Sequence, residues 1–236
     1  MEFNIKKPGN IVALVVILIS FYVLFFDPIL SYLNVFSLTE YLGFTNVSLV
    51  VLFTTILLTC TPFIWYFFVD RYSPKEMFYA LKLRSEGIDR AFLFGVIAAI
   101  LMFVITTVIA VVLFFVVDMD QEALAGVTKI AGGLSILSLI LIVFQAISAE
   151  IYLRGFLLEK IDSFAGKNMA IVVTAVLYGL IHLSYGELYP AILPIFLGII
   201  LGYVVMKTKN LYSAITAQIF FNIVVIVLNL VSLSIG

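Results

Sequence analysis

Three apolar stretches of the sequence each carry two polar side chains four residues apart. The pairs are Glu150 and Arg154, Tyr178 and His182, and Gln218 and Asn222. Residues at this spacing lie on the same face of an α-helix. A charged side chain in the middle of a membrane helix costs about 2.5–3.5 kcal/mol, so it is usually retained for a partner or a function. We therefore expect the three pairs to meet in one buried polar site.

These residue types suit hydrolysis of a peptide bond by an activated water. A carboxylate and an imidazole can polarise one water, directly or through a metal, while amide groups stabilise the oxyanion. No serine or cysteine stands with a base at a convincing spacing, so covalent catalysis ranks lower. Each pair alone also has a structural interpretation: a self-neutralising ion pair, a hydrogen-bonded core histidine, or amides that join helices.

The elements that must position these residues are membrane helices. Of the 236 residues, 64% are hydrophobic and 11% are charged, whereas a soluble domain is about half apolar and a quarter charged. At roughly 20 apolar residues per span, the sequence predicts about seven helices, at 11–26, 47–69, 91–117, 133–158, 169–183, 189–206 and 211–235. We expect an all-α, polytopic transmembrane bundle that forms a single integral membrane domain over residues 1–236.

The basic residues are distributed unevenly among the predicted loops. Only Lys129 falls on one side of the membrane, while the opposite side receives Lys6, Lys7, Arg71, Lys75, Lys82, Arg84, Arg90, Lys160, Lys167, Lys207 and Lys209. The positive-inside rule therefore predicts a cytoplasmic N-terminus and an external C-terminus. The net charge of −1 excludes nucleic acid as a partner, because phosphate binding needs a surplus of clustered positive charge.

Two local patterns predict further features of the bundle. Ser73 is followed three residues later by Glu76, a capping-box pattern that favours a short amphipathic helix within 71–90 on the cytoplasmic face. The alternative there is a solvated loop. Gly198 and Gly202 lie four apart in an apolar helix, which predicts close packing against a neighbouring helix, within the monomer in preference to a dimer.

Taken in order, the three pairs resemble the motifs of the CPBP (CAAX protease and bacteriocin-processing, or Abi) family of intramembrane metalloproteases. The family's first motif is two glutamates, three residues and an arginine, and here Ala149 and Glu150 precede Arg154. Its second motif is an aromatic residue, three residues and a histidine, which Tyr178 and His182 match.

The third motif of the family is a histidine, three residues and an asparagine or similar residue. Asn222 matches its last position, whereas Gln218 stands in place of the histidine. The resemblance covers about residues 135–230, and it implies a CAAX-protease-like helix bundle around that core. It also implies cleavage of peptide bonds, in some members just after a prenylated cysteine near a protein C-terminus, from the cytoplasmic side.

The resemblance also implies a role for each matched position. Glu150 corresponds to the second glutamate with Arg154 as its partner, and Asn222 corresponds to an oxyanion donor. His182 corresponds to the water-binding histidine and would be the ligand of any divalent metal such as zinc. Tyr178 would contact the substrate. The expected partners are membrane lipid and a peptide or prenylated protein C-terminus.

Two departures from the family pattern bear on catalysis. Ala149 occupies the position of the principal glutamate, and loss of a general base typically lowers a rate by about 10²–10⁴. Gln218 can still donate a hydrogen bond, but it cannot carry protons and is a poor zinc ligand. We therefore expect hydrolysis by this chain to be impaired, whether it is a natural pseudoenzyme or an enzyme altered at position 149.

Two other classes of function compete with an impaired endopeptidase. A non-catalytic scaffold or lipopeptide-binding protein would use the same fold and cavity without cutting, which the missing carboxylate at Ala149 favours. A transporter ranks third, because it needs a continuous polar path and the outer halves of the predicted helices look dry. The sequence thus leaves open whether the chain is an enzyme.

Overall fold

The computed structural model describes residues 7–43, 47–116, 136–185 and 189–235, and every regular element within those ranges is helical. A helix satisfies all its backbone hydrogen bonds internally, as a lipid environment requires. The elements are α1 (Pro8–Phe21), η1 (Tyr22–Phe26), α2 (Asp27–Tyr32), α3 (Leu38–Tyr41), α4 (Val47–Trp65), η2 (Tyr66–Asp70), α5 (Pro74–Ala80), α6 (Ile88–Val116), α8 (Ile136–Glu150), η3 (Ile151–Leu157), α9 (Leu158–Ala165), α10 (Lys167–Ile181), η4 (His182–Tyr185), α11 (Tyr189–Thr208) and α12 (Tyr212–Ile235).

Within the described ranges, five helices are long and apolar enough to cross a membrane, and two further apolar helices are shorter. The five are Pro8–Tyr32, Ser48–Asp70, Ile88–Ile109, Ile140–Ala165 and Ala191–Thr208, and the shorter two are Lys167–Ile181 and Tyr212–Leu228. Each overlaps one of the seven predicted spans, so the prediction of an all-α membrane bundle is confirmed. Parts of two predicted spans, at 117 and at 133–135, lie outside the described residues.

The sequence pattern did not predict three short π-helical segments: η1 and η3 lie within continuous helices, and η2 forms the last turn of the helix that begins with α4. The first lies directly before Asp27 and Pro28, and the helix continues through both to Tyr32, beyond the predicted end at residue 26. A proline cannot donate the usual backbone hydrogen bond, and a π-turn changes the hydrogen-bond register just where that donor is missing. η3 follows directly after Glu150 and carries Arg154 of the first motif, and such π-turns are frequent at functional sites.

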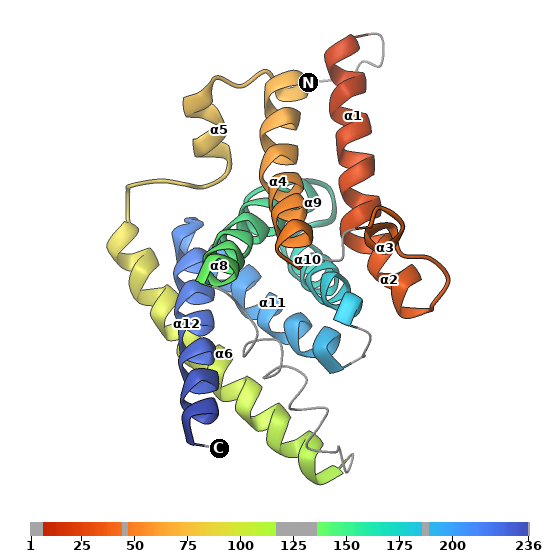
Figure 1. Ribbon diagram of the computed structural model, residues 1–236. Coiled ribbons are helices and arrows are strands. Elements are labelled where there is room, and N and C mark those ends of the chain that lie inside the picture. The colour runs from red at the N-terminus through yellow and green to blue at the C-terminus, as the bar shows by residue number, and fades with distance from the viewer. Residues whose placement is uncertain (1–6, 44–46, 117–135, 186–188, 236) are drawn as a thin grey trace.

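Helices α10 and α11 run side by side through the middle of the bundle, with α6 and α12 along one flank and α1 and α4 along the other (Figure 1). Their close approach depends on small residues. A Cβ atom at Gly198 would lie 2.8 Å from the Cα of Ala175, and one at Gly202 would lie 3.3 Å from the side chain of Ile171. The predicted close packing within the monomer is therefore present.

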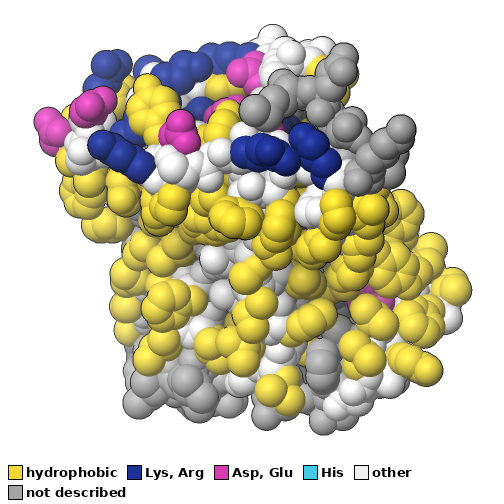
Figure 2. Space-filling model, turned by 90° about the horizontal axis from the view of Figure 1, so that it is seen from above, with side chains coloured by type: hydrophobic (Ala, Val, Ile, Leu, Met, Phe, Trp, Pro, Cys, Tyr) yellow, Lys and Arg dark blue, Asp and Glu magenta, His cyan; other side chains and the backbone are white. Residues whose placement is uncertain are grey.

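The segment between η2 and α6 combines a short helix with a turn. Helix α5 begins at Pro74, and the carboxylate of Glu76 accepts hydrogen bonds from the backbone N–H and the hydroxyl of Ser73, both at 2.7 Å. The predicted capping box is thus formed, but the helix ends at Ala80. Lys and Arg side chains gather at this end of the bundle, next to a surface covered by hydrophobic side chains (Figure 2). We call the end of the bundle where these Lys and Arg side chains gather the basic end.

Candidate functional site

Glu150 and Arg154 form an ion pair inside the bundle. Glu150 is the last residue of α8, and Arg154 lies in the middle of η3. Nη1 of Arg154 donates to Oε1 of Glu150 at 3.1 Å, and both side chains are fully buried, with 0% of their surface exposed. A buried pair of this kind is strongly destabilised when one partner is removed, because the other charge is then left uncompensated. The predicted partnership of these two residues is present.

The guanidinium of Arg154 also reaches two neighbouring helices. Its Nη2 donates to the backbone carbonyl of Gly198 on α11 at 3.3 Å, and its Cζ lies 4.7 Å from the centre of the Tyr178 ring on α10. The carbonyl is within reach because Gly198 has no side chain, and an added Cβ would lie 3.1 Å from Nη2. Arg154 therefore ties η3 to both central helices.

Tyr178 connects the ion pair to the other polar residues. Nε2 of Gln218 on α12 donates to the Tyr178 hydroxyl at 2.8 Å, and both residues are buried. The His182 ring meets the Tyr178 ring edge-on, with 5.1 Å between ring centres. The structure thus brings together side chains from five elements, α8, η3, α10, η4 and α12: Glu150, Arg154, Tyr178, His182 and Gln218. We call these five residues the polar cluster.

The structure sets the two remaining predicted site residues apart from these contacts. Ala149 packs in the hydrophobic core and is 7% exposed. Asn222 lies one turn beyond Gln218 on α12 and is half-buried. Among the described residues, no hydrogen bond joins Asn222 to the polar cluster. His182 lies beside the rest of the cluster through its contact with the Tyr178 ring.

Three buried polar atoms of the cluster have no hydrogen-bond partner among the described residues. They are Oε2 of Glu150, Nε of Arg154 and Oε1 of Gln218. Buried polar atoms are nearly always satisfied by protein or by water, so these atoms can accept or donate hydrogen bonds to a bound water or a peptide group. The cluster therefore offers both acceptors and a donor within the buried core.

The side chains of the polar cluster do not fit the ligand set of a resident zinc ion. A catalytic zinc site has three protein ligands, and no group of three His, Cys, Asp or Glu in the described ranges could hold a metal. Of the cluster residues, His182 and Glu150 are the two of a metal-binding type, and Glu150 already binds Arg154. Gln218, at the position of the family's second histidine, donates its amide to Tyr178.

Sequence reasoning missed a second set of polar contacts, which join η3 and α8 to α1 and α4. The hydroxyls of Tyr152 and Ser20 lie 3.1 Å apart in the core, Thr59 donates to Ser148 at 2.8 Å, and Gln145 donates to Thr54 at 2.8 Å. Hydroxyl and amide pairs commonly join membrane helices. Their spacing along α8 and η3, three or four residues, is a signal that the sequence contained.

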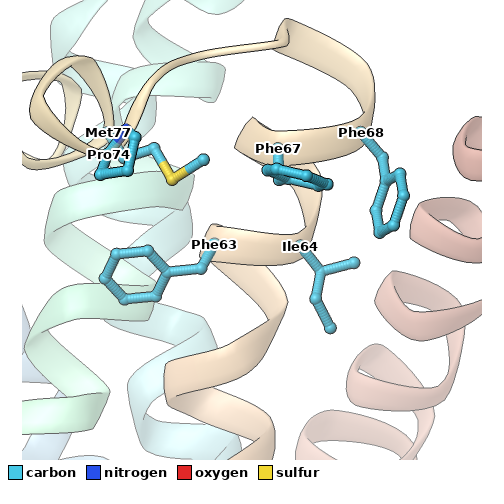
Figure 3. A pocket seen from close by; sticks show the side chains of 6 residues that line it. All are labelled: Phe63, Ile64, Phe67, Phe68, Pro74 and Met77. Atoms are coloured by element: carbon cyan, nitrogen blue, oxygen red, sulfur yellow. The ribbon is translucent and has the colours of Figure 1, made fainter.

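A separate pocket of about 350 Å³ opens between α4, η2 and α5 (Figure 3). Its lining is entirely hydrophobic and consists of Phe63, Ile64, Phe67, Phe68, Pro74 and Met77. One of these elements, η2, packs on η3, since the Tyr66 and Phe156 rings meet edge-on with 5.5 Å between their centres. The pocket thus adjoins the segment that carries Arg154, but it contains no residue of the polar cluster.

Comparison with known families identifies the part of the chain that holds the cluster. Residues 131–224 match the model of a family described as Type II CAAX prenyl endopeptidase Rce1-like. This segment includes all seven predicted site residues, and the match confirms the resemblance to the CAAX-protease family that the three motifs indicated. No curated protein and no solved structure matches the chain.

Proposed function

Starting from a membrane bundle whose residues 131–224 match the CAAX prenyl endopeptidase family, we propose that the protein is an intramembrane endopeptidase of this type with impaired hydrolysis. Its substrate is a peptide segment or a prenylated protein C-terminus, and its partners include membrane lipid. The basic end, from which the substrate enters, faces the cytoplasm. One observation carries the proposal: the family's principal glutamate is replaced by Ala149, and the adjacent carboxylate is already held by Arg154.

The contacts of Glu150 support a structural role for this residue. Its Oε1 binds Arg154, which in turn contacts Gly198 and Tyr178 on two other helices. A carboxylate that moved to activate water would leave Arg154 without its counter-charge in a fully buried setting, which is costly. Glu150 therefore holds the cluster together, and among the described residues the cluster has no second carboxylate for general-base catalysis.

The remaining members of the polar cluster support binding of a peptide group. The amide of Gln218 offers an unsatisfied acceptor, Oε1, beside the Tyr178 hydroxyl, and His182 lies against the same ring. A peptide N–H or a bound water satisfies that acceptor. If position 149 carried a glutamate, His182 would position the water, and the amide of Asn222 would stabilise the oxyanion.

The second candidate function is binding without cleavage. It is favoured by the absence of a carboxylate at Ala149 together with a cluster that retains hydrogen-bonding groups for a peptide. A scaffold or lipopeptide-binding protein would hold the same ligand in the same place. The two functions differ in what happens when the missing base is supplied.

The test is cleavage of a prenylated CAAX-type peptide and of a general reporter peptide by purified protein in lipid. The protein as it stands is compared with Ala149→Glu, with Ala149→Glu/Gln218→His, and with Ala149→Gln as a control of equal size without a base. We expect the carboxylate to raise the rate by about 10²–10⁴, and the glutamine variant to stay at the starting rate.

Three results would change this proposal. If the protein as it stands cuts as fast as Ala149→Glu, the base lies elsewhere in the cluster. If Ala149→Gln matches Ala149→Glu, the gain is a packing effect. If no variant cuts and all bind the prenylated peptide equally, the binding protein becomes the better assignment. Elution as a single symmetric species on size exclusion shows that each variant is folded.

A further inference from the structure

Three basic side chains at the basic end lie against two aromatic rings in an alternating row. On α6, Cζ of Arg90 lies 5.6 Å from the centre of the Phe94 ring. Nζ of Lys207 on α11 lies 4.7 Å from the same ring and 5.9 Å from the Tyr203 ring. Nζ of Lys167, at the start of α10, lies 5.7 Å from the Tyr203 ring. We call these five residues the cation–aromatic row.

Among the described residues, the cations of the row lack an acidic partner, whereas two other basic residues at this end have one. Lys82 pairs with Glu159 at 3.3 Å, and Lys160 pairs with Asp70 at 2.7 Å. Across the described parts of the chain, no carboxylate lies within ion-pair distance of the three cations in the row. All three side chains are exposed. Their charge is therefore available to an anionic ligand.

The surroundings of the row place it at a membrane surface. Tyr203 on α11 is 53% exposed, and further along these two helices Ile97 on α6 and Ile199 on α11 are 52% and 40% exposed. Exposed apolar side chains on a membrane bundle face acyl chains, while aromatic rings with adjacent cations are typical of the headgroup level. A ligand at the row would thus have its charge at the cations and its apolar part along α6 and α11.

Helix α10 adds partial positive charge at the same place. It begins at Lys167, and no side chain caps its N-terminus. The first backbone N–H groups of a helix have no intrahelical acceptor, and the helix dipole there favours an anion. Two ammonium groups thus converge beside the Tyr203 ring, and one of them belongs to Lys167, the first residue of α10.

We propose that the cation–aromatic row binds the phosphate headgroup of an anionic phospholipid in the leaflet at the basic end. Lys and Arg near a membrane surface attract anionic lipids, and basic sites between membrane helices are known to hold their headgroups. The bound lipid bridges α6, α10 and α11. Since the row uses none of the polar cluster residues, this proposal does not depend on the proposed endopeptidase function.

The experiment measures retention of phosphatidylglycerol against phosphatidylcholine on detergent-purified protein by native mass spectrometry. The test variant is Lys167→Gln/Lys207→Gln. The control is Arg71→Gln/Lys75→Gln, which removes the same charge from the same end but outside the row. We expect phosphatidylglycerol to bind about thirtyfold more weakly to the test variant. Its binding to the control variant should be the same as to the unaltered protein. The preference over phosphatidylcholine should also weaken as salt rises.

Several results would overturn the proposal. One is an equal loss in both double variants, which would indicate general surface charge in place of a site. A second is a protein that retains the two lipids equally, and a third is row-dependent binding of an acidic peptide but not of phosphatidylglycerol. Full competition by millimolar inorganic phosphate would show an anion site without lipid selectivity. Circular dichroism of each variant confirms that helix content is unchanged.

Discussion

Removing Arg154 alone tests whether the buried ion pair holds the cluster together. Arg154→Met retains an unbranched, apolar side chain but leaves the Glu150 carboxylate fully buried without its counter-charge. Loss of one partner of such a pair costs about 3–5 kcal/mol. For a chain of this size, each kcal/mol lowers the melting temperature by about 2–4 °C, so we expect a decrease of roughly 6–20 °C.

The double variant Glu150→Met/Arg154→Met shows whether the uncompensated charge causes that loss. Replacing both ions by apolar side chains of similar size is often close to neutral, so we expect the double variant to recover most of the stability lost by Arg154→Met. The assay is the loss of the monomer peak on size exclusion after heating in detergent. If the double variant is no more stable than Arg154→Met, the uncompensated charge is not the cause of the loss, and Glu150 would be free to act as a base.

Three further predictions concern the framework around the site. Gly198→Ala places a Cβ 2.8 Å from the backbone of α10 and should lower stability by about 1–3 kcal/mol, more than Gly202→Ala, as compared by heating and size exclusion. Asn210→Ala removes hydrogen bonds of 2.8 and 3.2 Å to two carbonyls of the turn before α6, so that turn should be cut faster in limited proteolysis. Hydrogen bonds from the hydroxyl and the backbone N–H of Ser73 lower the pKa of Glu76. The capping box is thus fully stabilising above the ordinary glutamate pKa and is lost as the pH falls through the lowered pKa. Ser73→Ala should therefore make α5 sensitive to protease at a higher pH than in the unaltered protein.

The local patterns of the sequence predicted the elements well but their ends less well. Apolar length and the alternation of basic loops located all seven spans, because both depend on composition within one segment. The capping box between Ser73 and Glu76 was likewise predicted, since its donors and acceptors are three residues apart. The sequence did not predict that the first helix continues to Tyr32, because a π-turn before Pro28 changes the backbone register without altering the hydrophobic pattern.

Contacts between helices required the tertiary structure. The sequence paired Glu150 with Arg154 and Tyr178 with His182, since each pair follows from helical spacing within one chain segment. It did not show that Gln218 would bind the Tyr178 hydroxyl, because that depends on how α12 is rotated and shifted relative to α10. The same holds for the cation–aromatic row, whose members come from three helices.

By itself, the sequence determined a membrane bundle, the polar pairs on its helices, and the replacement of the family's principal glutamate by Ala149. The packing of the helices shows in addition that the carboxylate of Glu150 is bound to an arginine that also contacts Gly198 and Tyr178. The physical reason is that spacing fixes which side chains share a helix face. Packing between helices fixes which groups on different faces come within hydrogen-bond distance.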